Sequence, residues 1–167
     1  MKAAEVIIRK ARHKDAGELS ELFRASWQLA YRGIIPHLNL ETMIRNRQQP
    51  WWQRMIAAGE NMLVMELVDG VAGYATFGRS RWPLKPEGEI YELYLGPVYQ
   101  GIGLGEQLFE ATRHRLEMRR LKGLVVWALK DNEGACDFYH RRGGRPIART
   151  HESFGHSKIE KIAYGFA

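Results

Sequence analysis

The stretch YLGPVYQGIGLGEQL, residues 94–108, places four glycines and one proline between an apolar run and a helical pattern. Glycine costs conformational entropy, so such a loop is unfavourable unless the backbone itself has a task there. Where a helix follows a strand, its first N–H groups have no backbone partner, and the helix dipole adds partial positive charge. Glycines without a β-carbon let an anion approach those N–H groups. The stretch therefore predicts a phosphate-binding loop.

Two common phosphate-binding loops fit this spacing badly. A P-loop has Lys followed by Ser or Thr after its last glycine, whereas Gly105 is followed by Glu106 and Gln107. A dinucleotide fingerprint needs a glycine at position 106 and an acidic residue about 20 residues beyond the loop. The segment GLVVWA at 123–128 is apolar instead. The sequence therefore excludes a P-loop and disfavours a dinucleotide-binding loop.

The elements around the loop alternate in a way that defines a fold class. Asp15 offers an N-cap for the first helix, and Pro50 breaks a second helical stretch, which resumes at 51–58. Asp69-Gly70 between two apolar runs is a strong hairpin signal. The other expected strands lie at 5–11, 89–95, 124–129, about 145–150 and 158–166, and two further helices follow Gly105 and Asn132. The order β-α-α-β-β-β-α-β-α-β-β predicts one α/β domain over residues 1–167, a mixed central sheet of about seven strands flanked by helices on both faces.

Composition narrows the class of function. A net charge of +6 attracts anions, but the basic residues are spread along the chain, which favours solvated helix faces over a nucleic-acid site. The chain has no apolar run of about 18 residues, and its start lacks the pattern of a secretory signal, so we expect no membrane partner and a cytoplasmic location. Cys136 stands alone and the six histidines show no ligand spacing, so we expect no metal.

The glycine loop resembles the coenzyme-A loop of the GNAT superfamily of N-acetyltransferases, in which Gln or Arg, two residues, Gly, one residue, and Gly or Ala follow one another. Gln100, Gly103 and Gly105 match that pattern. The segments ELYL with the following proline, WALKDN, and NEGACDFYHRRGG also resemble the family, as does the order of strands and helices. The sequence departs from the usual pattern at Gly144, where the family commonly has Phe, which puts local packing in question.

The resemblance implies acetyl-CoA as co-substrate. Its diphosphate is expected on the N–H groups of Gly101, Ile102, Gly103, Leu104 and Gly105, and its pantetheine arm along the strand at Leu93, Tyr94 and Leu95, with help from Gln100 and Asn132. Ile102 and Glu106 stand where a basic residue is frequent. More distant cations, Arg141 or Arg142, are then needed to balance the phosphates.

Acetyl transfer to an amine needs a group that accepts the ammonium proton and a group that protonates the leaving thiolate. Tyr139 matches the family's proton donor, although a core aromatic is its other reading. Glu89 and Glu92 are the candidate bases, with a slight preference for Glu89. Three residues apart, they point to opposite faces of a regular strand unless a bulge intervenes.

Acceptor specificity is expected from the segments between the first two helices and from the loop at 80–88, where the chain carries Trp27, Tyr31, Trp51, Trp52 and Trp82. Trp27, Tyr31 and Trp82 are the candidate substrate-binding residues, and core packing is the alternative for each. The predicted function is acetyl transfer to a primary amine of a small molecule or protein. A catalytically silent acyl-CoA-binding module of the same fold is the competing hypothesis, and the sequence leaves a homodimer through the last strands open.

Overall fold

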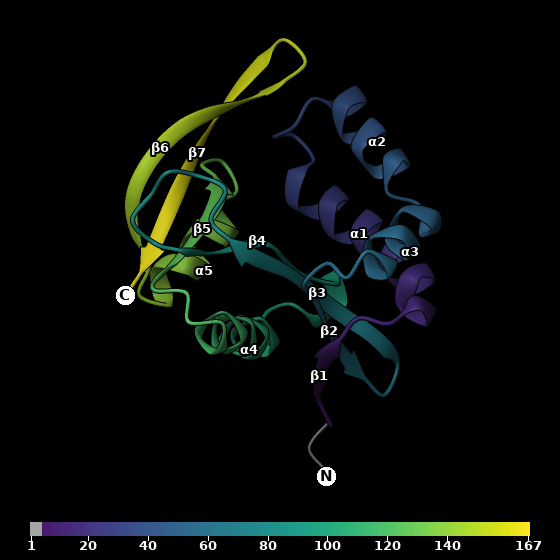
Figure 1. The fold of residues 1–167 in the computed structure, drawn as a ribbon. Coiled ribbons are helices and arrows are strands. Elements are labelled where there is room, and N and C mark those ends of the chain that lie inside the picture. Colours follow the sequence, from purple (N-terminus) through teal and green to yellow (C-terminus); the bar gives the residue numbers. More distant parts are fainter. Residues whose placement is uncertain (1–4) are drawn as a thin grey trace.

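The computed structural model describes residues 5–167 as one mixed seven-stranded sheet with helices on both faces (Figure 1). The predicted fold class is confirmed. The helices are α1 (Ala16–Tyr31), α2 (His37–Asn46), α3 (Gln49–Ala57), α4 (Leu104–Met118) and α5 (Glu133–Arg141). The strands are β1 (Ile7–Lys10), β2 (Met62–Leu67), β3 (Gly70–Arg79), β4 (Gly88–Leu95), β5 (Leu124–Leu129), β6 (Arg145–Phe154) and β7 (Ser157–Phe166). α2 ends at Asn46 and α3 begins at Gln49, so Pro50 lies in the first turn of α3, where proline is tolerated although it would break a helix interior.

The strands lie in the order β1-β2-β3-β4-β5-β7-β6, and only β4 and β5 run parallel. Their pairing is short: it joins Gly88, Glu89 and Ile90 to Leu124, Val125 and Val126, and then stops. Beyond Ile90, β4 stays paired with β3 alone. The sheet is therefore split at its centre, and the second half of β4 has a free edge.

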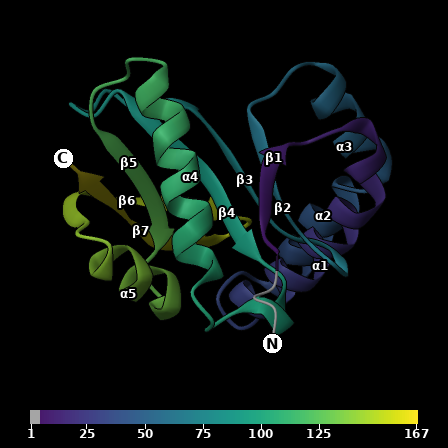
Figure 2. The ribbon, with the colours of Figure 1, turned by 90° about the horizontal axis from the view of Figure 1, so that it is seen from below.

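The two faces of the sheet carry separate cores. Helices α1, α2 and α3 cover the half made by β2, β3 and β4 on one face, while α4 and α5 lie on the other face (Figure 2). The first core gathers Phe23, Trp27, Trp52 and Tyr74, and the second gathers Phe109, Tyr139 and Phe166. Because strand side chains alternate between faces, the central strands β2, β3, β4, β5 and β7 contribute to both cores.

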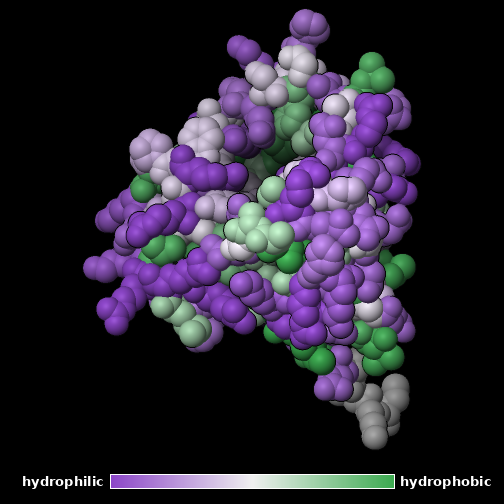
Figure 3. Space-filling view, turned by 45° about the vertical axis from the view of Figure 1, so that its right-hand side comes forward, coloured by the Kyte–Doolittle hydropathy of each residue, from purple (hydrophilic) through white to green (hydrophobic). Residues whose placement is uncertain are grey.

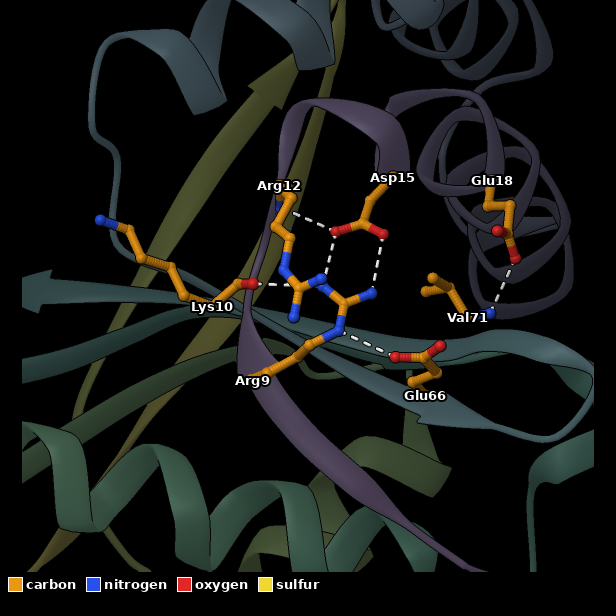
Figure 4. Close-up of polar contacts among 7 residues, drawn as sticks. All are labelled: Arg9, Lys10, Arg12, Asp15, Glu18, Glu66 and Val71. Atoms are coloured by element: carbon orange, nitrogen blue, oxygen red, sulfur yellow. Dashed lines mark hydrogen bonds and ion pairs between the residues drawn. The ribbon is translucent and has the colours of Figure 1, made fainter.

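A partly buried ion-pair network joins β1, β2 and the start of α1 (Figure 4). Asp15 does precede α1, but its side chain makes no capping bond to that helix, so the expected role as a side-chain cap is wrong. Its carboxylate instead accepts hydrogen bonds from the Arg9 guanidinium at 2.8 and 2.9 Å and from the Arg12 amide at 2.7 Å. Arg9 also donates to Glu66 on β2 at 2.8 Å.

The visible surface is mostly hydrophilic, and its hydrophobic residues form small separate patches (Figure 3). Within residues 5–167, no helix is both long and apolar enough to cross a membrane. The same residues contain no cluster of three or more histidine, cysteine or carboxylate side chains suited to a metal ion.

Candidate active site

The split between β4 and β5 opens into a cavity of about 600 Å³. Its walls come from α1, the free edge of β4, the glycine loop and α5. The lining residues are Ser26, Leu29, Ala30, Leu93, Tyr94, Leu95, Gln100, Gly101, Gly103, Gly105, Glu106, Asn132, Gly134, Ala135, Asp137, Phe138, Tyr139, Arg141 and Arg142. Nine of the residues expected to hold the co-substrate line this one cavity: Leu93, Tyr94, Leu95, Gln100, Gly101, Gly103, Gly105, Asn132 and Tyr139.

The glycine loop presents its amides at one end of the cavity. The N–H groups of residues 101–106 donate no hydrogen bond to any other described residue, and α4 begins at Leu104. Gly101 and Gly103 have φ angles of +79° and +84°, and a β-carbon at either position would meet no atom within 4 Å. Ile102 is exposed and Leu104 is buried, and both side chains are apolar. These two residues can therefore contact an anion only through their backbone amides. The amides form an open anion-binding concavity at a helix N-terminus.

Two arginines at the end of α5 line the same cavity. Arg141 lies 3.0 Å from the Asp137 carboxylate, and Arg142 lies 3.3 Å from the Glu106 carboxylate. These pairs are partly exposed, so the arginines can exchange their partners for a phosphate at little cost. They supply the positive charge that the loop itself lacks at Ile102 and Glu106.

The free edge of β4 carries backbone groups into the cavity. The Gly96 amide donates to the Ala72 carbonyl of β3 at 2.8 Å. Because hydrogen-bonding groups alternate along an antiparallel strand, the amides and carbonyls of Leu93 and Leu95 point away from β3, toward the open side. Gln100 already uses one of these groups, since its amide nitrogen donates to the Leu95 carbonyl at 3.2 Å.

Asn132 and Tyr139 face β4 from α5 across the cavity. Asn132 caps α5 by accepting a hydrogen bond from the Ala135 amide at 3.3 Å. The Tyr139 ring is buried against Phe109, Phe138 and Tyr164. Its hydroxyl makes no hydrogen bond to the described residues, although it belongs to the cavity lining. Burial raises the pKa of Tyr139 well above the usual value, so the hydroxyl keeps its proton at neutral pH.

A β-bulge decides where the two candidate glutamates point. Phe77 pairs with Ile90 and Thr76 pairs with Glu92, so Tyr91 is an extra residue in β4. Glu89 lies opposite Gly78 and Glu92 opposite Thr76, and these two β3 residues share a face. The bulge therefore puts Glu89 and Glu92 on the same face of the sheet, which is the face that carries α1, α2 and α3.

Each glutamate is held by an arginine. Glu89 is fully buried and accepts hydrogen bonds from the Arg81 amide at 3.0 Å and from the Arg81 guanidinium at 2.8 Å. Glu92 accepts from the Arg47 guanidinium at 2.7 and 2.9 Å. Neither side chain is part of the cavity lining. A proton from an acceptor amine would need a further group or a water molecule to reach either carboxylate.

Arg47 lies in an aromatic box. Its guanidinium carbon is 4.3 Å from the Trp51 ring centre and 4.8 Å from that of Phe23, with Trp27 and Trp52 at 5.7 and 6.0 Å. The Arg47 carbonyl accepts a hydrogen bond from the Trp52 indole at 3.0 Å. Cation–π attraction and the backbone bond fix this arginine, and through it they fix Glu92.

A pair of tyrosine hydroxyls connects α1 with β4. Tyr31 and Tyr94 are hydrogen-bonded to each other through their hydroxyls, and Tyr94 lines the cavity. Burial raises the pKa of Tyr31 to about 12, and the nearby Glu92 and Glu152 carboxylates add to this rise. Burial likewise raises the pKa of Tyr94. The pair is neutral at physiological pH, and Tyr94 lies on the same face of β4 as Glu92.

The three candidate acceptor residues have different surroundings. Trp27 is buried in the first core against Phe23 and Tyr31, and it does not line the cavity, so its environment is that of a packing residue. Tyr31 borders the cavity through Tyr94. Trp82 lies in the loop between β3 and β4 and packs on Trp127 of β5 at a ring-centre distance of 4.9 Å.

Several residues of the site were missed by the sequence reasoning. Ser26, Leu29 and Ala30 bring α1 into the cavity wall, and their spacing of three and four residues was the available signal. Phe138 also lines the cavity and packs over Gly105, whose missing β-carbon leaves room for the ring. Arg47 and Arg81 gave no signal, because nothing in the local sequence tells which distant carboxylate an arginine will reach.

Comparison with known proteins gives the family. The model of the acetyltransferase (GNAT) family matches residues 17–144. The chain belongs to the GNAT acetyltransferase family. The uncharacterized N-acetyltransferase YuaI of Bacillus subtilis is 22% identical over 166 residues, which cover 96% of this chain and 92% of YuaI. A mycothiol acetyltransferase of Acidothermus cellulolyticus is 30% identical over 113 residues, but these make up only 35% of that longer protein.

Solved structures with the same fold include GNAT enzymes bound to coenzyme A. The PaiA N-acetyltransferase of Thermoplasma acidophilum, solved in complex with coenzyme A, superposes with a TM-score of 0.73 at 19% identity and covers 94% of this chain and 98% of its own. YncA of Salmonella typhimurium, solved with acetyl-CoA, gives a TM-score of 0.68 at 19% identity over 97% of this chain and 93% of its own. At such identities the likeness concerns the fold.

Proposed function

We propose that this GNAT protein transfers the acetyl group of acetyl-CoA to a primary amine, by direct attack of the amine in a ternary complex. The observation that carries the proposal is the set of unpaired amides at residues 101–106, at one end of a cavity that continues to Tyr139 and the free edge of β4. A diphosphate needs several N–H donors and a nearby cation, and the loop with Arg141 and Arg142 offers both.

The pantetheine arm fits the free edge of β4. Its amide groups can pair with the backbone of Leu93 and Leu95 as an added strand would. Asn132, whose side-chain oxygen is already used to cap α5, still has its amide N–H groups for the arm. This places the thioester where β4 and β5 separate, close to Tyr139.

The residues around that point can support acyl transfer. The amine forms a bond to the thioester carbon, the carbon–sulfur bond breaks, and the Leu95 amide is placed to stabilise the negative charge on the carbonyl oxygen. The thiolate that leaves takes a proton from the Tyr139 hydroxyl, which burial keeps protonated. Tyr139 can regain a proton from solvent through the cavity it lines.

Glu92 is the better supported of the two candidate bases. It lies on the same face of β4 as Tyr94, two residues away, and therefore near the hydroxyl pair beside the cavity. Glu89 is enclosed by the Arg81 backbone and side chain at a greater remove from that pair. We propose that the ammonium proton of the acceptor passes to Glu92 through a water molecule.

The proposal is tested by ligand-induced stabilisation and by thiol release. A ligand at 100 times its Kd stabilises a protein by about 2.7 kcal/mol, which raises the melting temperature of a chain of this size by roughly 5 to 10 °C. We expect such a rise with acetyl-CoA and none with NAD or ATP. Acetyl-CoA should then release thiol in the presence of amines, and a rise in melting temperature without thiol release over a broad amine panel would favour the silent binding module.

A further inference from the structure

The half of the sheet that no helix covers carries a lysine in an unusual setting. Helices α1, α2 and α3 stand over β2, β3 and β4, and the same face of β5, β7 and β6 lies beside them without a helix of its own (Figure 1). Lys161 of β7 is on this face, because it pairs with Leu129 of β5, a member of the first core. Its side chain is only 13% exposed.

The Lys161 ammonium lies over two indole rings. Its nitrogen is 4.6 Å from the ring centre of Trp82 and 5.0 Å from that of Trp127. The nearest carboxylate oxygen, on Glu152 of β6, is 3.9 Å away, which is too long for a hydrogen bond. The Lys161 ammonium makes no hydrogen bond to the described residues, although the backbone of Lys161 pairs with β5 and β6. Cation–π attraction holds the charge in place, but its three N–H donors remain available.

This lysine is close to the end of the cavity where the acceptor must arrive. Leu129, its neighbour on β5, is three residues before Asn132, and the Asn132 amide bonds back to the Leu129 carbonyl at 3.0 Å. Glu152 of β6 lies 3.9 Å from the Lys161 ammonium, on the same side of the sheet. With the co-substrate between the glycine loop and β4, the face around Trp82, Lys161 and Glu152 is the side left for a second substrate.

The charges on this face match a molecule that carries both a positive and a negative charge. Glu152 is half exposed and lies 3.9 Å from the Lys161 ammonium, so a protonated amine would be attracted to this face before it loses its proton. Lys161 offers free N–H donors to an anion beside an indole surface, and Trp82 is still 37% exposed. The neighbouring Arg81 is already neutralised by Glu89 and stacks on Tyr91, so it adds no free positive charge.

We propose that the acceptor is a carboxylate-bearing amine, such as an amino acid, whose carboxylate binds Lys161 and whose apolar side group packs on Trp82. This inference rests on the proposed acetyl transfer and adds the substrate class. A charge-assisted hydrogen bond is worth enough to favour the carboxylate over its neutral amide by about 10- to 100-fold in kcat/KM. The preference should appear mainly in KM, since the contact is made before and during the reaction alike.

The experiment compares thiol release from acetyl-CoA with L-phenylalanine, L-tryptophan and ω-amino acids against their carboxamides. We expect the carboxylates to be preferred in the wild type and in Lys158→Met, and the preference to vanish in Lys161→Met. Lys158 is the matched control, because it is an exposed lysine of the same strand. Equal rates for acids and amides, or a preference that survives in Lys161→Met, would overturn the inference.

A binding measurement separates this inference from the proposed catalysis. Calorimetric titration of the same amino acids into protein saturated with CoA needs no turnover. Binding that is lost in Lys161→Met and kept in Lys158→Met supports the carboxylate site. If no thiol is released in that case, the proposed catalysis is wrong while the proposed carboxylate site stands. If the carboxamides bind as tightly as the amino acids, the carboxylate site is contradicted, whether or not thiol is released.

Discussion

Replacing Tyr139 by Phe removes the proposed proton donor and leaves the packing intact. The ring is buried against Phe109, Phe138 and Tyr164, and Phe keeps all of these contacts. The hydroxyl makes no hydrogen bond to the described residues, so the free energy of unfolding should change by no more than about 0.5 kcal/mol. General acid catalysis by a positioned side chain contributes roughly 100- to 10,000-fold, or about 3 to 5 kcal/mol in the activation free energy.

The assay is thiol release at saturating acetyl-CoA, with binding of acetyl-CoA and the melting temperature measured on the same sample. We expect kcat to fall by at least about 100-fold while the affinity for acetyl-CoA and the melting temperature stay close to wild type. Tyr164→Phe is the matched control, because Tyr164 packs on Tyr139 and does not line the cavity. An unchanged kcat in Tyr139→Phe, or an equal fall in both variants, would refute the reasoning.

Three further variants test the loop, the base and the fold. Gly103→Ala and Gly59→Ala both place a side chain at a positive φ of about +80° with no atom nearby, so each should cost about 1 to 2 kcal/mol in stability. Only Gly103→Ala should weaken acetyl-CoA binding in a titration. Equal affinities of the two variants for acetyl-CoA would count against the loop as the binding site. Arg47→Met leaves Glu92 without its cation and should lower the melting temperature by roughly 6 to 12 °C, whereas Arg45→Met on the exposed side of α2 should leave the melting temperature unchanged. Asp15→Asn should lower stability at neutral pH by about 3 kcal/mol. Burial raises the Asp15 pKa, but the hydrogen bonds from Arg9 and the Arg12 amide outweigh burial and hold the pKa below its usual value. The greater stability of the wild type over Asp15→Asn should therefore be present above about pH 4 and disappear as the pH falls through the folded-state pKa. A stability difference that persists in acid would contradict this linkage.

The order of the elements was accessible from the sequence because its signals are local. The hairpin at Asp69-Gly70, the interruption at Pro50 and the glycines before α4 each report a backbone requirement that neighbouring residues cannot override. The cavity lining could be anticipated for the same reason. Gln100, Gly101, Gly103 and Gly105 act through their positions along one loop, and Asn132 and Tyr139 are set by one short helix.

The ion-pair partners of charged residues could not be predicted from such local sequence signals. Asp15 looks like a helix cap in one dimension, but the fold brings Arg9 against it, and a guanidinium binds a buried carboxylate more strongly than a helix N-terminus does. The bulge at Tyr91 reverses the expected orientation of one glutamate, and it depends on how β4 pairs with β3. The contact of Arg47 with Glu92 spans 45 residues and is defined only in three dimensions.

The central claim is that the amides of the glycine loop bind the diphosphate of the co-substrate. The most direct measurement is the crystal structure of the protein grown with coenzyme A. The account predicts diphosphate oxygens within hydrogen-bonding distance of the N–H groups of residues 101–105 and the pantetheine arm along Leu93 and Leu95. Coenzyme A bound elsewhere, or a cavity without it at saturating concentration, would contradict the claim.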